Sequence, residues 1–98
     1  MARLTKLSRS INNRAVLITG AGAGQGRSTA HLFADEGAHV AVTDLQQSAV
    51  DQVVSEITEA GGSAKGWTMD VSNRDRVEKV VGEVAATFGG LDYLVNNA

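Results

Sequence analysis

Hydrophobic and polar residues follow two patterns along this chain, short apolar runs and longer amphipathic segments. The apolar runs are short and rich in β-branched residues, which predicts strands over Ala15–Thr19, His39–Asp44, Ala64–Asp70 and Leu91–Asn96. Each run is separated from the next by a segment long enough for a helix. The chain is therefore expected to alternate strictly between strands and helices.

Apolar residues three and four positions apart predict the helices between these strands. A first helix is expected from about Gly24 to Glu36, with Gly37 closing it. The next two helices end at glycine pairs, Gly61-Gly62 and Gly89-Gly90. Their apolar faces comprise Val50, Val53, Val54 and Ile57 in the second helix and Val77, Val80, Val81, Val84, Ala85 and Phe88 in the third.

Ser72 and Asp75 have the spacing of a capping box and are expected to start the third helix. The resulting order is β-α-β-α-β-α-β. Strands joined through helices form a parallel sheet with right-handed crossovers. The expected fold class is α/β, a Rossmann-like three-layer α/β/α arrangement with strand order 3-2-1-4, truncated after the fourth strand.

Composition is that of an ordinary globular domain. The 98 residues are 43% hydrophobic and 20% charged, a size that allows one domain. The absence of cysteine excludes disulfides and thiolate metal sites, and two histidines, His31 and His39, form no ligand cluster. Both histidines are expected on the surface or in helix packing, and Trp67 in partly buried packing.

Charge divides the chain into a basic start and an acidic remainder. Five basic residues and no acidic residue precede Asp35. Residues 1–13 are interpreted as a basic, solvated tail, with an organelle-targeting segment or a nucleic-acid arm as alternatives, and residues 14–98 as the domain. No run is long enough for a membrane span. We expect a cytoplasmic protein with no nucleic-acid or membrane partner.

The segment from Thr19 to Arg27, TGAGAGQGR, holds four glycines between the first strand and the first helix. A glycine-rich turn there brings unobstructed backbone N–H groups and the positive end of a helix dipole to one point, which favours phosphate. The lysine of a mononucleotide P-loop is absent, because Arg27-Ser28 follows Gly26. The strand–turn–helix context therefore predicts nucleotide binding, with a purely structural glycine turn as the alternative.

Asp44 ends the second strand, where a carboxylate accepts hydrogen bonds from the adenosine ribose hydroxyls. Its negative charge would repel a 2′-phosphate. The alternative is an aspartate that only serves the following turn. Together with the glycine segment, Asp44 predicts NAD as cofactor, with NADP disfavoured.

These residues carry a family resemblance that extends from Arg14 to the end of the sequence. Thr19, Gly20, Gly24 and Gly26 match the Thr-Gly-x-x-x-Gly-x-Gly pattern of the short-chain dehydrogenase/reductase family. Asp70-Val71 resembles the family's adenine-contacting pair, and Asn96-Asn97-Ala98 resembles its Asn-Asn-Ala-Gly motif.

The resemblance implies a role for each matching position. Asp44, with Leu45 beside it, would bind the adenosine ribose, Asp70 and Val71 the adenine, and Asn96 and Ala98 the nicotinamide side. Thr19 would brace the glycine segment. The pyrophosphate and nearby ribose would be lined by Gly20, Ala21, Gly22, Ala23, Gly24, Gln25 and Gly26.

Two positions in the glycine segment depart from common family members. Gln25 stands where isoleucine is common, which is expected to alter packing on the nicotinamide side. Ala23 stands where many NADP-dependent members carry a basic residue. The missing basic residue agrees with the preference for NAD inferred from Asp44.

The family's catalytic serine and Tyr-x-x-x-Lys pair lie beyond its Asn-Asn-Ala-Gly motif. Tyr93 is the only tyrosine, and Asn97 rather than lysine follows four positions later. The resemblance therefore implies the dinucleotide-binding part of an enzyme that moves hydride between a nicotinamide cofactor and an alcohol or carbonyl. Without the catalytic groups, this part is expected to be inactive alone.

Two alternatives stay open, an interaction module whose unpaired fourth strand docks on another chain and an inert remnant. That strand would lie at the sheet edge and favour self-association. The resemblance implies a homo-oligomer for the parent protein and a small alcohol or carbonyl substrate only in a complete protein. Asp92 is expected to cap a turn.

Overall fold

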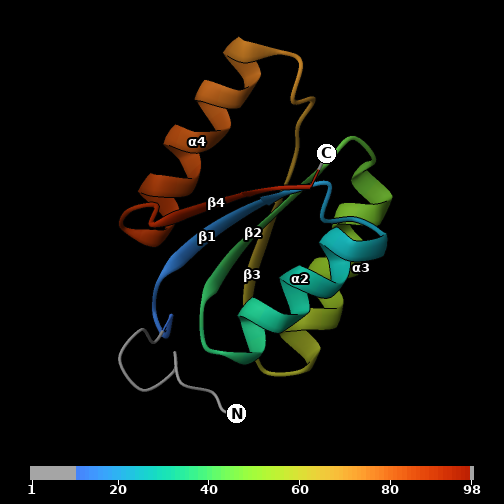
Figure 1. Cartoon of the computed structure of the whole chain (residues 1–98), viewed down its shortest axis with the longest axis vertical. Coiled ribbons are helices and arrows are strands. Elements are labelled where there is room, and N and C mark those ends of the chain that lie inside the picture. The colour runs from blue at the N-terminus through green and yellow to red at the C-terminus, as the bar shows by residue number, and fades with distance from the viewer. Residues whose placement is uncertain (1–10, 98) are drawn as a thin grey trace.

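The computed structural model describes residues 11–97. Most of the predicted basic tail, residues 1–10, and the predicted site residue Ala98 lie outside the described residues. The described chain forms a four-stranded parallel sheet in the order β3-β2-β1-β4, which confirms the predicted topology (Figure 1). The elements are β1 Ala15–Thr19, α2 Gly24–Asp35, β2 His39–Asp44, α3 Gln47–Glu59, β3 Ser63–Thr68, α4 Arg74–Phe88 and β4 Tyr93–Asn96.

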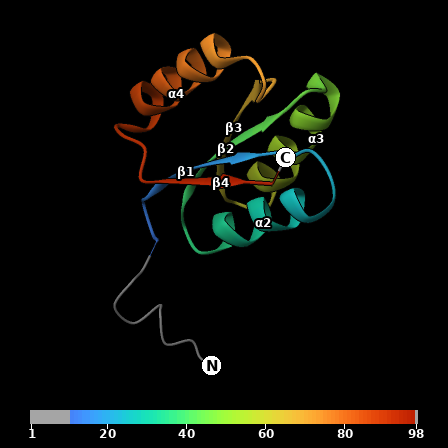
Figure 2. The same cartoon turned by 45° about the horizontal axis from the view of Figure 1, so that its top comes forward.

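The sheet is the middle of three layers. Figure 2 shows α4 on one face and α2 and α3 on the other. Val16 and Ile18 of β1 face the α2–α3 side, while Leu17 between them packs with Val80 and Val84 of α4. All three β1 side chains are fully buried, because β1 has a strand on each side and helices on both faces.

Two strands differ at their ends from the sequence prediction, since the ladder of hydrogen bonds sets where a strand ends. β3 ends at Thr68 because its partner β2 ends at Asp44, so Asp70 lies in the turn that follows. β4 begins at Tyr93 opposite Val16, and Leu91 lies in the approach to the sheet. The first helix also ends one residue early, at Asp35.

The predicted capping box at Ser72 is wrong. Asn73 is the N-cap of α4, and its side chain accepts a hydrogen bond from the Arg76 amide at 3.1 Å. Gly89 ends this helix in the left-handed conformation with φ of 80°, as its place after Phe88 predicts. Within residues 11–97, none of the helices is both long and apolar enough to cross a bilayer.

Candidate functional site

The loops that follow β1, β2 and β3 and the end of β4 lie at the carboxyl edge of the sheet, because the strands are parallel. Figure 1 shows the end of β4 beside the loop that joins β1 to α2. Thr19 links the two strands: its buried hydroxyl donates to Asn96 Oδ1 at 3.0 Å and accepts from the Asn97 amide at 3.0 Å. The first and last predicted segments are therefore in direct contact.

The glycine segment is fixed by contacts with the end of β2. The Ala21 amide donates to the Thr43 carbonyl at 2.9 Å, and the Gly22 amide donates to Asp44 Oδ2 at 2.8 Å. The other oxygen, Asp44 Oδ1, accepts from the Leu45 amide at 2.6 Å. Both oxygens of this carboxylate are thus oriented by backbone donors.

The N-terminus of α2 has no capping side chain. Its N-cap is Ala23, whose methyl group cannot accept a hydrogen bond, and its first turn, from Gly24, contains no acidic residue. The positive end of the helix dipole is therefore not neutralised by its own first turn. Gly26 packs directly on the loop, because a Cβ at that position would overlap the Gly20 carbonyl group.

A cavity of about 240 Å³ lies beside this loop. Five predicted site residues line it together with one that the sequence analysis missed, Met69. Met69 is 5% exposed and belongs to the α4-side core, while two apolar side chains at the rim, Leu45 and Val71, are exposed. The complete lining is Gly20, Asp44, Leu45, Met69, Asp70 and Val71.

Asp70 is the second carboxylate of this cavity. Its Oδ1 accepts two hydrogen bonds from Ser72, from the hydroxyl at 2.6 Å and from the amide at 2.9 Å. The Ser72 hydroxyl and then the Ser72 amide hold the pKa of Asp70 below its usual value. Asp70 is therefore an ionised hydrogen-bond acceptor at neutral pH.

One buried donor at the junction of β1 and β4 has no partner. The Nδ2 atom of Asn97 is buried and makes no hydrogen bond with any residue between 11 and 97. Leaving such a donor unpaired costs ~1–3 kcal/mol. The backbone amide of the same residue donates to the Thr19 hydroxyl, so a polar partner for Nδ2 is expected at this end of the sheet.

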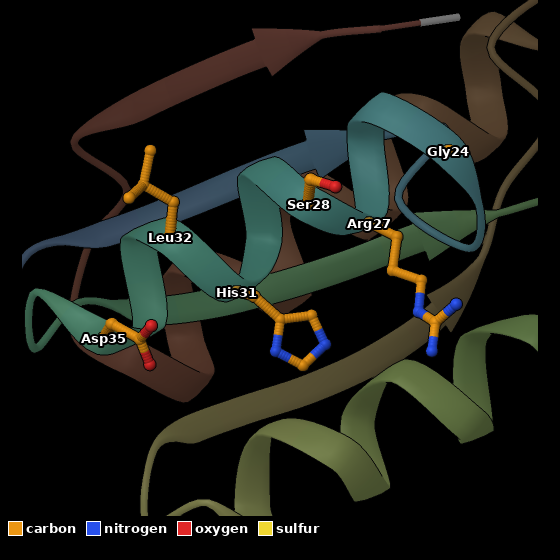
Figure 3. A pocket seen from close by; sticks show the side chains of 6 residues that line it. All are labelled: Gly24, Arg27, Ser28, His31, Leu32 and Asp35. Atoms are coloured by element: carbon orange, nitrogen blue, oxygen red, sulfur yellow. The ribbon is translucent and has the colours of Figure 1, made fainter.

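A larger cavity, about 680 Å³, runs along the outside of α2 from Gly24 to Asp35 (Figure 3). Its cationic side chain, Arg27, extends toward α3 and donates through Nε to Glu56 Oε1 at 3.0 Å. His31 Nε2 lies 2.8 Å from the same carboxylate. Arg27 is thus paired with Glu56, and Gly24 is the predicted site residue among those that line this cavity.

Other residues singled out in the sequence have packing contacts. His39 stacks on Phe88 with ring centroids 5.5 Å apart, and Trp67 lies edge-on to the same ring. Asp92 does more than cap a turn, because its Oδ2 accepts from the Ala15 amide at 2.8 Å and fixes the start of β1. These contacts lie away from the 240 Å³ cavity.

The fold and the uncapped glycine loop at the carboxyl edge define a Rossmann-like α/β protein. The model of the family described as short chain dehydrogenase matches residues 14–98. The chain therefore belongs to the short-chain dehydrogenase/reductase family.

Individual relatives agree with this assignment. The chain is 38% identical over 88 residues to the 3-oxoacyl-(acyl-carrier-protein) reductase FabG of Thermotoga maritima, covering 90% of this chain and 36% of the relative. It is 39% identical over 92 residues to the cyclohexanol dehydrogenase of Acinetobacter sp. strain SE19, covering 94% of this chain and 37% of that relative. The crystal structure of the Escherichia coli hydroxysteroid dehydrogenase superposes with a TM-score of 0.88 at 36% identity, covering 90% of this chain and 37% of that structure. The chain thus spans little more than a third of each of these three proteins.

Proposed function

We propose that this chain is the cofactor-binding part of an NAD-dependent short-chain dehydrogenase/reductase. The single observation that carries the proposal is the contact between Asp44 and the Gly22 amide at the rim of the 240 Å³ cavity. It holds a carboxylate beside the N-terminus of α2, where a pyrophosphate would sit. Ribose hydroxyls would then donate to Asp44, and the negative charge of Asp44 would repel a 2′-phosphate.

The residues present fit a dinucleotide along the whole edge. Gly22 and Gly26 allow close packing of the loop, because a Cβ at Gly22 would lie 2.8 Å from Asp44 Oδ2 and one at Gly26 would overlap the Gly20 carbonyl group. The Cβ position of Gly24 is open, and the α2 N-terminus offers amides to phosphate oxygens. Asn96 lies at the end of β4, where the nicotinamide ribose is expected. The bound cofactor supplies the hydride, while this chain's residues bind and orient it.

The reaction of the whole protein is proposed to be hydride exchange with a small alcohol or carbonyl compound. The support is the family and the alcohol named for the Acinetobacter relative. Proton transfer to the substrate needs a positioned acid or base. These 98 residues contain no Tyr-x-x-x-Lys pair, so we expect the chain to bind cofactor without turnover. A cytoplasmic location is part of the same proposal.

A second proposal concerns β4, which is the edge of the sheet. Among residues 11–97 its backbone pairs with β1 alone, and Tyr93 and Leu94 are 46% and 61% exposed. An exposed edge with apolar side chains favours pairing with another strand. We therefore expect this chain to self-associate through β4, and a homo-oligomer of the parent protein is the related proposal.

The test of cofactor choice is titration of the chain with NADH and NADPH, followed by nicotinamide fluorescence. We expect tighter binding of NADH. Asp44→Asn removes the charge but keeps an oxygen that can accept from Gly22, whereas Asp44→Ala removes both. Both variants should narrow the gap between NADH and NADPH, because the repulsion of the 2′-phosphate is lost in each. Asp51→Asn, on the exposed surface of α3, is the matched control and should change neither affinity.

Two results separate the parts of this proposal. NADPH binding as tight as NADH binding in the unmodified chain would refute the preference for NAD and leave the dinucleotide site standing. No saturable binding of either cofactor by the folded chain would refute the dinucleotide site itself.

A further inference from the structure

Ser72 has no role in starting α4, because Asn73 caps that helix. The Ser72 hydroxyl instead donates back to Asp70 Oδ1 at 2.6 Å, and the Ser72 amide donates to the same oxygen at 2.9 Å. Asn73 also closes this turn by donating its amide to the Asp70 carbonyl at 3.0 Å. The turn between β3 and α4 is thus built around the Asp70 side chain.

These contacts leave the two oxygens of Asp70 in different states. Oδ1 has two donors, while Oδ2 makes no hydrogen bond to any residue in the described range 11–97. Because Ser72 also keeps the pKa of Asp70 low, the carboxylate is an acceptor and not a donor. A partner of this free oxygen must therefore be a hydrogen-bond donor.

Asp70 lies between two apolar residues in the wall of this cavity, whose other carboxylate, Asp44, is held by the Gly22 and Leu45 amides. Met69 before it and Val71 after it line the same cavity, and Leu45 lines it from the end of β2. Apolar side chains suit the faces of a flat aromatic ring, and a carboxylate suits an amino group on its edge. This combination matches a purine that carries an exocyclic amine.

We propose that Ser72 is a positioning residue that fixes the Asp70 carboxylate as an acceptor in this cavity, so that the cavity selects a 6-amino purine over a 6-oxo purine. The inference rests on the proposed function, since the purine is the base of the dinucleotide. Adenine would donate from its amine to Asp70. Hypoxanthine places a carbonyl oxygen at that position, where two acceptors would face each other.

The test compares reduced NAD with its hypoxanthine analogue, reduced nicotinamide hypoxanthine dinucleotide, by isothermal titration calorimetry. The unmodified chain should bind reduced NAD more tightly. Ser72→Ala should lower this preference by about threefold to tenfold, the range expected for one hydrogen bond that orients an exposed carboxylate. Ser72→Thr keeps the hydroxyl and should retain the preference, and Ser55→Ala on the exposed face of α3 should leave it unchanged.

A second measurement tests the hydrogen bond between Ser72 and Asp70 in the absence of any cofactor. Carbon-13 NMR titration should show the pKa of the Asp70 carboxyl below its ordinary value in the unmodified chain and higher in Ser72→Ala. A purely structural role of Ser72 in the turn would leave the choice between the two bases unchanged.

The outcomes distinguish this inference from the proposed function. Equal preference for reduced NAD in the unmodified chain and in Ser72→Ala would overturn the inference and leave the cofactor site intact. An ordinary pKa for Asp70 would overturn it as well, because the contact would be absent. If neither dinucleotide binds while the Asp70 carboxyl still titrates low, the cofactor site is refuted and base selection falls with it.

Discussion

The sharpest prediction concerns Gly26, where α2 packs on the loop after β1. A Cβ added at Gly26 would overlap the Gly20 carbonyl oxygen and lie 2.7 Å from the carbonyl carbon and 3.1 Å from Ala21 Cα. All of these are backbone atoms, so no side-chain rotation relieves the overlap. Ala21 is fully buried and its amide is held by Thr43, so the loop resists moving.

The size of the effect follows from the displacement that Gly26→Ala requires. Ordinary van der Waals contact begins at 3.4 Å, so relieving the overlap with the Gly20 carbonyl oxygen requires α2 and the loop to separate by about 1.4 Å. Overpacking of this kind costs ~1–3 kcal/mol. Separating the helix N-terminus from the loop also disturbs the proposed phosphate site, so NADH affinity should fall together with stability.

Two other glycines separate the effects of helix propensity and of backbone strain from the effect of close packing. Gly82 lies within α4 with open space around its Cβ position, so Gly82→Ala should stabilise the chain by ~0.5–1 kcal/mol. Gly24 has equally open space but a φ of 57°, so Gly24→Ala should cost ~1 kcal/mol from backbone strain alone.

The assay is urea unfolding followed by far-ultraviolet circular dichroism, combined with NADH titration of each variant. The expected order of stability is Gly82→Ala, then the unmodified chain, then Gly24→Ala, then Gly26→Ala. A Gly26→Ala variant as stable as Gly82→Ala, or one with unchanged NADH affinity, would contradict the close packing on which the proposed phosphate site depends.

Three further predictions concern pH, activity and association. Hydrogen bonds from Arg27 and then His31 lower the pKa of Glu56 to about 2 from its ordinary 4.5, so its stabilising contribution is present above about pH 4.5 and is lost as the pH falls toward 2. Urea midpoints should therefore fall less between pH 6 and pH 3 in Glu56→Gln than in the unmodified chain, and equal falls would refute the ion pair. The chain alone should reduce no NAD with cyclohexanol, and reproducible reduction by protein free of host dehydrogenases would refute the expected inactivity. Light scattering after size-exclusion chromatography should show association that weakens on dilution and in Leu94→Lys, whereas a monomer at every concentration would contradict pairing through β4.

Much of the fold could be predicted from the sequence because hydrophobic periodicity and glycine placement act locally. β1 and β2 have the predicted bounds, since Arg14 and Gly20 flank β1 and the polar residues His39 and Asp44 stand at the two ends of β2. The ends of β3 and β4 could not be predicted as well. They depend on where the neighbouring strands β2 and β1 stop and start, which is a property of the register rather than of the local sequence.

Some residues of the candidate site could likewise be predicted from the sequence, and others could not. The glycine segment and Asp44 could be found from their spacing, and the structure places them in contact. The sequence could not show that Ser72 turns toward Asp70, because serine before a helix most often caps it and Asn73 competes for that position. Met69 was missed because a buried apolar residue at a strand end has the same pattern whether or not it lines a cavity.

The contacts of Asp44 and Asp70 have a shared consequence for ligand binding. Backbone amides of Gly22 and Leu45 orient the first carboxylate, and Ser72 orients the second, without any ligand. A group that is already oriented loses less conformational entropy on binding, so more of its hydrogen-bond energy appears as affinity. The same donors also limit what the site accepts, because each fixed carboxylate favours a hydroxyl or amine and repels a phosphate or carbonyl oxygen. If the proposed function is right, we expect selectivity at this edge to depend on these hydrogen bonds within two turns. Substitution of Gly22, where a Cβ would lie 2.8 Å from Asp44 Oδ2, or of Ser72, which donates to Asp70, should therefore change it without a direct contact between the substituted residue and the ligand.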